Sequence, residues 1–427
     1  MKRPWAVGGW LLGVAALLLG APLVLDGIPA AEGTSPAAAT ATALERGRQL
    51  ALAGNCGGCH TARGGAAYAG GRPIGTPFGT VYAGNLTPDA DTGLGRWSAA
   101  QFRRALRHGV GADGRRLVPA FPYTETTKIS DADADALFAW LRSLPPVKQA
   151  NPPHRLRWPY GTQTALAAWR LAFFRPGAWQ DDATKSREWN RGAYLVNGAG
   201  HCVACHGGRN ALGGTADAGF GGGLIPTRNW YAPAFTRAAE ASVAEWPLDD
   251  IVALLRDGAA PRGRAIGPMA EVVVQSTQHL PEADLRAMAL YLKSLPVEAP
   301  APRAGFVPPE PGVLAQGAQL YSDHCAACHG DDGDGGALPD GRLVVPALAG
   351  NRLVAMDPAV NLVRAIALGG FGAPTAARPQ PFGMPPFAHV LDDGQLAAVT
   401  THLRARWGAG AGPVSAFDVS RWRGADD

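Results

Sequence analysis

This sequence has few charged residues and no nucleotide-binding motif. Only 17% of its 427 residues are charged, the formal net charge is +4, and no long basic block occurs. Nucleic-acid binding is therefore not expected, because neutralising phosphates requires clustered Lys and Arg. Glycine-rich nucleotide loops, catalytic triads and convincing strand alternation are also missing, so no substrate-converting site is evident in the chain.

The composition nevertheless predicts a folded protein. Hydrophobic residues make up 47% of the chain, which excludes a largely disordered polypeptide and is enough for two to three packed domains. The 56 glycines and 36 prolines predict long loops. Because strand alternation is missing, we expect an all-α fold whose helices are joined by these loops.

The six cysteines are all placed in three copies of one pentapeptide, and none is left over. Each copy has the pattern C-x-x-C-H, which is typical of covalent attachment of a c-type haem. A zinc site or a thioredoxin-like redox pair would not require a histidine directly after every pair. We therefore expect three covalent haem c groups, held by Cys56, Cys59, Cys202, Cys205, Cys325 and Cys328, with axial imidazoles from His60, His206 and His329.

The three motifs lie in a threefold internal repeat. A helix carrying a glycine precedes each motif, at Gly47, Gly192 and Gly317. A middle helix and a last amphipathic helix follow, and the middle helix ends at a glycine. The middle helices are expected at 99–108, 248–257 and 361–368, and the last ones at 130–144, 281–295 and 392–407.

The fold class expected from these repeats is three tandem cytochrome c-like domains behind an N-terminal segment. The expected boundaries are a signal or anchor helix at 1–28, a tether at 29–42, domains at 43–150, 183–299 and 300–427, and an aromatic and Arg-rich linker at 151–182. Aromatic residues beside arginines are typical of a membrane-interface or protein-docking face, and equally of a helix packed across two haem domains.

The N-terminal segment predicts export across a membrane. Lys2 and Arg3 precede an uncharged run over residues 5–25, which is long enough as a helix to span roughly 31 Å. The positive-inside rule keeps the two basic residues in the cytoplasm. The body of the protein is therefore expected at the periplasmic face of the cell membrane, with cleaved and uncleaved forms of the segment both open.

Methionine is rare, which narrows the search for sixth iron ligands. The chain has five methionines, and Met269 and Met384 fall in Pro/Gly-rich loops before the last helix of their domains. His–Met ligation raises the reduction potential of a haem and suits electron transfer, so we expect these two as axial ligands. Met288 and Met356 are expected to fill the core.

The first domain departs from this pattern. Phe121 stands where the methionine is expected, and a phenyl ring cannot bind iron. His108 is a candidate substitute, although its equivalents in the other repeats are not ligands. Lys128 and Tyr123 are further candidates, and a five-coordinate, water-bound or partner-ligated iron is also open. The loss of a Met ligand is expected to change the potential of this haem.

Four further stretches carry a family resemblance. The sequence resembles the tri-haem cytochrome c subunit of membrane-bound bacterial dehydrogenases, such as quinoprotein alcohol dehydrogenase and flavin-dependent gluconate or sorbitol dehydrogenase. Similar cytochromes accompany some molybdenum hydroxylases, and Phe121 tilts the resemblance toward these. The matching stretches are 75–82, 85–89, 189–196 and 381–388.

The resemblance implies an electron relay. Electrons would pass from a flavin, quinoprotein or molybdenum catalytic subunit to ubiquinone or a terminal oxidase. The chain would then be the electron-transfer subunit of an oxidoreductase complex. Two alternatives remain: a multi-haem peroxidase that uses an open iron in the first domain, and a gas or redox sensor. The donor's substrate, the order of haem potentials and quinone binding do not follow from the sequence.

Overall fold

The computed structural model describes residues 26–27, 40–215, 219–225, 227–299, 308–337, 343–381 and 383–424. The chain divides into two compact units: residues 1–182, 194–204 and 209–216 form one, and residues 183–193, 205–208 and 217–427 form the other. The expected signal or anchor at 1–28 and tether at 29–42 lie almost wholly outside the described residues. Within the described part, no helix is both long and apolar enough to cross a membrane.

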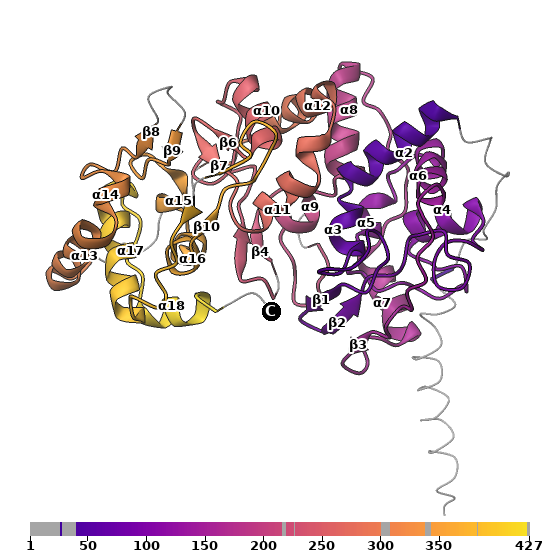
Figure 1. Ribbon diagram of the computed structural model, residues 1–427, viewed down its shortest axis with the longest axis horizontal. Coiled ribbons are helices and arrows are strands. Elements are labelled where there is room, and N and C mark those ends of the chain that lie inside the picture. The colour runs from indigo at the N-terminus through magenta and orange to yellow at the C-terminus, as the bar shows by residue number, and fades with distance from the viewer. Residues whose placement is uncertain are drawn as a thin grey trace, which may run out of the picture. The chain divides into compact units, whose positions relative to one another are not determined.

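The first unit consists of helices with one small sheet (Figure 1). Its antiparallel sheet has the order β1-β2-β3. Figure 1 draws the strands below helices α3 and α5. The elements are α2 (Ala41–Ala53), α3 (Cys56–His60), β1 (Pro73–Thr76), β2 (Gly79–Tyr82), α4 (Ala99–His108), α5 (Tyr123–Thr126), α6 (Asp131–Arg142), β3 (Arg155–Leu156), α7 (Gln163–Phe173) and the π-helical turn η1 (Leu195–Ala199).

The second unit repeats this helical plan. Its first part contains α8 (Arg187–Tyr194, the last residue of which belongs to the first unit), α9 (Val203–His206, which spans the boundary), β4 (Gly223–Ile225), β5 (Trp230–Ala232), α10 (Leu248–Asp257), β6 (Ala259–Ala260), β7 (Gly263–Arg264), α11 (Pro268–Gln275), the 3-10 turn η2 (Thr277–His279) and α12 (Glu282–Lys293).

The remainder of the second unit completes the repeat. It contains α13 (Pro311–His324), α14 (Ala326–His329), β8 (Gly336–Ala337), β9 (Leu343–Val345), α15 (Arg352–Ala355), α16 (Val360–Leu368), β10 (Gly370–Phe371), β11 (Gly383–Met384), α17 (Asp393–Trp407) and α18 (Ala416–Trp422). Helix α18 was not expected from the sequence.

The predicted helices form where the sequence places them. Helices α4 and α10 match their predicted ranges, and α6, α12, α16 and α17 match within a few residues at each end. Ser98 caps α4 and Asp392 caps α17 through capping boxes, because each side chain accepts from the third backbone N–H of its helix. Gly109 and Gly258 end α4 and α10 in the left-handed conformation, as expected.

One helix crossing occurs three times and explains the glycine before each motif. Helix α2 packs on α6 and α13 on α17, and the same crossing joins α8 to α12. A β-carbon at Gly47, Gly192 or Gly317 would overlap a backbone carbonyl of the last helix of its repeat, namely that of Ala136, Ala287 or Ala398. Only glycine allows two helix backbones to approach so closely.

The all-α expectation needs one correction. The protein is mostly helical, but short antiparallel hairpins lie between the helices, in particular β1-β2, β4-β5 and β8-β9. Each of their strands has only two to four residues. Strands this short do not produce a run of alternating polar and apolar residues, so their pattern could not be found in the sequence.

The aromatic segment 151–182 contains helix α7, which packs within the first unit. The Arg170 guanidinium lies over the rings of Phe174 and Tyr123, at 4.6 and 5.4 Å from their centroids. Trp169 makes an edge-to-face contact with Tyr123. Part of the segment stays outside this packing, because the side chain of Trp158 is 85% exposed.

Candidate functional site

Each C-x-x-C-H motif forms about one helical turn, as α3, α9 and α14. The first cysteine of each pair is partly buried, and the second is exposed. Burial raises the pKa of Cys56 to about 12 and that of Cys325 to about 11, so these thiols are not poised as reactive thiolates. Among the residues that the structure describes, no three Cys, His, Asp or Glu side chains gather as a metal-ion site.

Each of the three motif histidines makes the same kind of hydrogen bond, from its ring to a backbone carbonyl oxygen. The Nδ1 atom of His60 lies 2.6 Å from the carbonyl oxygen of Gly84, that of His206 lies 2.8 Å from Pro233 O, and that of His329 lies 3.1 Å from Pro346 O. A carbonyl can only accept, so each Nδ1 carries the proton and each Nε2 keeps its lone pair. Metal-binding imidazoles are commonly oriented by such a bond.

Burial keeps these imidazoles neutral. It lowers the pKa of His60 and His329, and it lowers that of His206 to about 4. A neutral ring with a free Nε2 is the form that binds a metal. Two thiols on one turn and an oriented imidazole directly after them therefore fit the donor set that a covalent haem c requires.

A hairpin supplies the accepting carbonyl in every repeat. Gly84, Pro233 and Pro346 directly follow or nearly follow the second strand of β1-β2, β4-β5 and β8-β9. A second hydrogen bond is made by the backbone of each motif histidine, whose carbonyl oxygen accepts from the N–H of a glycine at the start of the following loop. These donors are Gly70, Gly222 and Gly335, at 2.8, 2.8 and 2.9 Å. We call this pair of bonds on one histidine the histidine clamp.

The clamp glycines are required by geometry. Their φ angles are +79°, +74° and +75°, in the region that side chains disfavour. A β-carbon at Gly70 would lie 2.5 Å from the carbonyl carbon of Gly84, whose oxygen accepts from His60. The sequence marks these positions, since a Gly-Gly pair stands at each of them: 70–71, 222–223 and 335–336.

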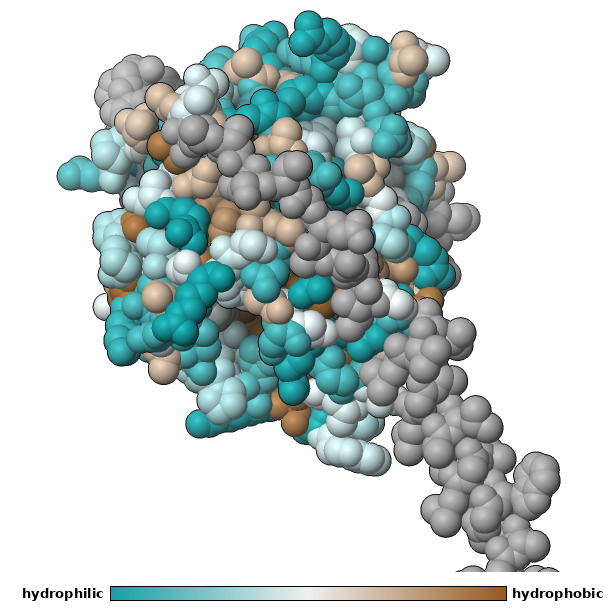
Figure 2. All heavy atoms as spheres, turned by 90° about the vertical axis from the view of Figure 1, so that its right-hand side faces the viewer, coloured by the Kyte–Doolittle hydropathy of each residue, from teal (hydrophilic) through white to brown (hydrophobic). Residues whose placement is uncertain are grey.

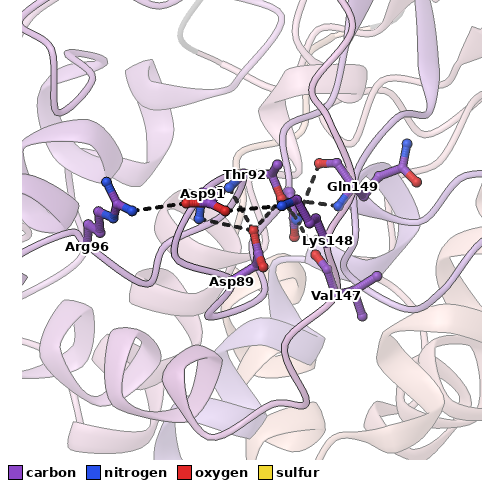
Figure 3. A network of polar contacts seen from close by, with 8 residues as sticks. Asp89, Asp91, Thr92, Arg96, Val147, Lys148 and Gln149 are labelled. Atoms are coloured by element: carbon purple, nitrogen blue, oxygen red, sulfur yellow. Dashed lines mark hydrogen bonds and ion pairs between the residues drawn. The ribbon is translucent and has the colours of Figure 1, made fainter.

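Hydrogen bonds of Asn85, the residue after Gly84, hold the first histidine clamp in place. Its backbone N–H donates to Asn151 Oδ1 at 2.7 Å, and its Nδ2 donates to the carbonyl of Val147 at 2.8 Å and to Thr92 Oγ1 at 3.0 Å. Figure 3 shows the adjoining network, in which the loop 89–92 meets the segment 147–149 through Asp89, Asp91, Thr92 and Lys148. The side-chain amide of Asn85 therefore makes hydrogen bonds to other residues of the protein. These bonds hold the peptide that contains the Gly84 carbonyl in place.

The backbone places Phe121 and Met269 at equivalent positions. After the left-handed glycine that ends the middle helix, Leu117 N donates to Gly109 O and Ala265 N donates to Gly258 O, at 2.7 and 2.8 Å. Four residues later, Phe121 N and Met269 N each donate to the carbonyl three residues earlier, at 3.1 and 3.2 Å. The first repeat therefore presents a phenyl ring where the second presents a thioether.

The predicted axial methionines lie in short elements. Met269 is the second residue of α11, which is a correction to the expected loop: Pro268 fixes φ at the first helical position and starts a helix there. Met384 lies in β11 opposite Gly370 and packs against the core of the last repeat. Met288 and Met356 are core residues, as expected, with 4% and 5% of their surface exposed.

The three candidates for replacing the methionine ligand in the first domain each contact other residues of the protein. The ring of His108 stands edge-on to Phe174, and its backbone carbonyl accepts from Arg170. Lys128 Nζ donates to the carbonyl of Asn197 at 3.2 Å. Tyr123 is fully buried, and its hydroxyl has no hydrogen-bond partner among the described residues.

Comparison with known proteins identifies a family and several relatives. Residues 44–145 and 314–407 match the family described as cytochrome c. The chain is 41% identical to a subunit of the nicotinate dehydrogenase of Pseudomonas putida over 390 residues, which are 90% of this chain but only 31% of that protein. The chain thus spans about a third of that relative.

Two other relatives are matched over most of their length. The cytochrome c subunit of the quinone-type alcohol dehydrogenase of Gluconobacter oxydans is 35% identical over 99% of this chain and 88% of its own. The gluconate 2-dehydrogenase cytochrome c subunit of Pantoea cypripedii is 37% identical, over 89% of each chain.

Proposed function

From the premise that the chain belongs to the multihaem cytochrome c subunits of dehydrogenases, we propose that it relays electrons from a catalytic subunit through three covalent haem c groups. The observation that carries the count of three is the histidine clamp, which recurs with both of its bonds at His60, His206 and His329. A bound haem c supplies a one-electron iron couple.

The residues of the chain divide this work. The paired cysteines would hold the porphyrins by thioether bonds: Cys56 with Cys59, Cys202 with Cys205, and Cys325 with Cys328. Each clamped histidine would bind a haem iron, and the clamp fixes the ring and its proton. Met269 and Met384 would also bind the iron in the second and third domains. Phe121 leaves the first domain without this methionine ligand, which would give its haem a different potential.

The partners follow from the relatives. Each of the three relatives described above is a dehydrogenase subunit by name. The proposed electron donor is therefore a dehydrogenase catalytic subunit of flavin, quinoprotein or molybdenum type. The proposed acceptor is ubiquinone or a terminal oxidase. The proposed location is the periplasmic face of the cell membrane, because basic residues precede the apolar run at 5–25.

A peroxidase function is not favoured. The named relatives are dehydrogenase subunits. Peroxide reduction also needs a positioned acid or base at an open iron. The carboxylate nearest Phe121 in the sequence loop is Glu125, which is 3% exposed and accepts from the hydroxyl of Thr124 at 2.6 Å.

The test is reduction of the purified holoprotein by its catalytic partner. The partner is taken from the genes that neighbour this one, and the dehydrogenase substrate is added anaerobically. We expect the reduced α-band to appear only when chain, partner and substrate are all present, with little peroxide turnover by the chain alone. Rapid peroxide turnover, or no reduction by any neighbouring oxidoreductase, would contradict the proposal.

A further inference from the structure

The peptide group between Pro233 and Ala234 is hydrogen-bonded at both ends. Its carbonyl oxygen lies 2.8 Å from Nδ1 of His206, which is the ring bond of the second histidine clamp. Its N–H donates to Oε2 of Glu240 at 2.7 Å. The side chain of Glu240 is 7% exposed, and Ala234 is fully buried. A buried carboxylate is therefore joined to the motif histidine through one peptide group.

The surroundings of Glu240 suit an ionised carboxylate. Its Oε2 also accepts from the hydroxyl of Tyr231 at 3.0 Å, and its Oε1 accepts from Arg237 Nη1 at 2.9 Å. Burial and, after it, the charge of Glu240 raise the pKa of Tyr231, so the hydroxyl keeps its proton and donates. An ionised carboxylate can only accept, and these partners are all donors.

The arginine that pairs with Glu240 compensates its charge only in part. The side chain of Arg237 is 46% exposed, and it also pairs with Glu298, which is 47% exposed. Water screens charges in such positions. Among the described residues on the face drawn in Figure 2, hydrophilic side chains predominate, and charges there are screened in the same way. Glu240, by contrast, lies in the interior against the clamp.

The backbone around this carboxylate is closely fitted. A β-carbon at the clamp glycine Gly222 would lie 2.7 Å from the nitrogen of Ala234 and 2.9 Å from the hydroxyl of Tyr231. The loop that carries Glu240 is closed by a bond from Ala241 N to Ala234 O at 3.0 Å. The carboxylate is thus placed by a short loop that begins at the bridging peptide itself.

The first repeat has a neutral group at the equivalent place. The carbonyl of Gly84 holds the ring of His60. The N–H of the next residue, Asn85, donates to Oδ1 of Asn151 at 2.7 Å, and Asn151 is exposed. The same peptide bridge therefore ends at a buried carboxylate in the second repeat and at an exposed carboxamide in the first.

A charge at one end of such a bridge strengthens the hydrogen bond at the other end. Hydrogen bonds to charged acceptors are stronger than those to neutral ones, and hydrogen bonds in a chain polarise one another. Glu240 therefore makes the Pro233 carbonyl a better acceptor, which makes the imidazole of His206 a more basic ligand. A more basic ligand favours the oxidised form of a bound iron, because that form carries one more positive charge.

We propose that Glu240 is a positioning residue that lowers the reduction potential of the second haem by acting through the Pro233–Ala234 peptide on His206. The inference rests on the proposed function, because it requires a haem at this histidine. Met269 would raise this potential and Glu240 would lower it. The second potential would then be set between two opposing groups of the same repeat.

The experiment is a redox titration of the full holoprotein that carries Glu240→Gln. Glutamine keeps the size and an acceptor oxygen and removes the charge. We expect one midpoint potential to rise, because the equilibrium constant for reducing that haem increases about tenfold, which is 59 mV for one electron. The other midpoints are expected to stay in place. No shift, a fall, or an equal shift of every midpoint would overturn the inference.

Glu298→Gln is the matched control. It removes a carboxylate from the exposed end of the same network, where Glu298 accepts from Thr236 Oγ1 at 2.6 Å and from Arg237 Nε at 3.2 Å. We expect its midpoints to match those of the wild type. A shift as large as that of Glu240→Gln would show that any neighbouring charge is sufficient, and would contradict the inference.

A second variant covers the case in which Glu240→Gln does not fold. Arg237→Gln changes a half-exposed side chain and leaves the carboxylate of Glu240 without its guanidinium partner. We expect the same midpoint to move in the opposite direction, to a lower potential. An unchanged or raised midpoint in this variant would overturn the inference.

A spectroscopic readout follows the bridge itself. In the reduced protein, the proton on His206 Nδ1 is expected to move upfield in the proton NMR spectrum of Glu240→Gln, because its bond to the Pro233 carbonyl weakens. A shifted potential with this proton unmoved would show that the charge acts through space, and would overturn the route through the peptide.

Mass spectrometry of the peptide that contains Cys202 and Cys205 separates this inference from the proposed function. A haem on that peptide together with unshifted potentials would refute the role of Glu240 and leave the electron relay intact. A mature peptide without haem would refute the proposed function at the second motif.

Discussion

The side chain of Asn361 pairs with the backbone of Tyr231 through two hydrogen bonds. Asn361 Oδ1 accepts from Tyr231 N at 2.8 Å, and Asn361 Nδ2 donates to Tyr231 O at 2.7 Å. Tyr231 lies in β5, two residues before Pro233, whose carbonyl holds His206. Helix α16 of the third repeat therefore supports the histidine clamp of the second repeat.

Replacement of Asn361 by alanine is expected to destabilise the second unit. The change leaves a buried N–H and a buried carbonyl of Tyr231 without partners, at about 1 to 3 kcal/mol each. We expect the free energy of unfolding to fall by about 2 to 4 kcal/mol, measured by denaturant titration. Gln319→Ala is the control, since the amide of Gln319 bonds to Asp323 on an exposed helix face. A loss no larger than that of the control would contradict the stated contribution of Asn361.

The clamp glycine of the first repeat has a matched control. Gly70 and Gly114 have φ angles of +79° and +80°, but only Gly70 faces backbone at close range, whereas a β-carbon at Gly114 meets nothing within 4 Å. Gly114→Ala is expected to cost about 1 kcal/mol from its backbone conformation alone. Gly70→Ala is expected to cost clearly more and to lower haem attachment at Cys56 and Cys59.

Haem attachment at this site is measured by mass spectrometry of the peptide that contains the first motif. Equal behaviour of the two alanine variants would show that the close approach of Gly70 to Gly84 does not shape the His60 site.

Two methionines of the second domain are expected to behave differently. Met269→Leu removes the thioether and should lower one reduction potential on the order of 0.1 V, because Met ligation raises the potential of a haem. Met288→Leu conserves volume in the core and should leave all potentials within a few millivolts, at less than about 1.5 kcal/mol of stability. A redox titration followed in the visible spectrum measures both; a shift in the second variant alone would reverse the assignment.

A methionine at position 121 is expected to supply the missing ligand. Phe121 has the backbone position of Met269, so Phe121→Met places a thioether where the second domain has one. We expect one potential to rise and the weak red absorption band of ferric His–Met haem to gain intensity. Phe102→Met, on a buried face of α4 packed against Phe138, is the control. An unchanged spectrum in the first variant would contradict the equivalence of the two positions.

Much of the helical framework could be predicted because it depends on local signals. Gly109 and Gly258 end helices in the left-handed conformation that glycine adopts at low cost, and the predicted ranges of α4 and α10 match the structure. The glycine before each motif could be placed in a helix from its repeat. The sequence does not show why a glycine is needed there. The glycine contacts a backbone carbonyl of the last helix, about 80 to 95 residues further along the chain, and this contact exists only in the folded protein.

The histidine clamp could not be predicted for a different reason. The accepting carbonyls follow their histidines at unequal intervals, at Gly84, Pro233 and Pro346, because the hairpins differ in length. A backbone carbonyl also leaves no residue signature. Only the Gly-Gly pairs were readable in the sequence, and their meaning depends on close approach of two backbones.

The number of covalent haems per chain tests the central claim most directly. The mature holoprotein is denatured, separated from non-covalent haem, and its haem is quantified against the protein by the pyridine haemochrome spectrum. Three clamped histidines, each after a cysteine pair, predict three haems per polypeptide with thioether linkages at every motif. Two or fewer covalent haems in fully matured protein would contradict the account.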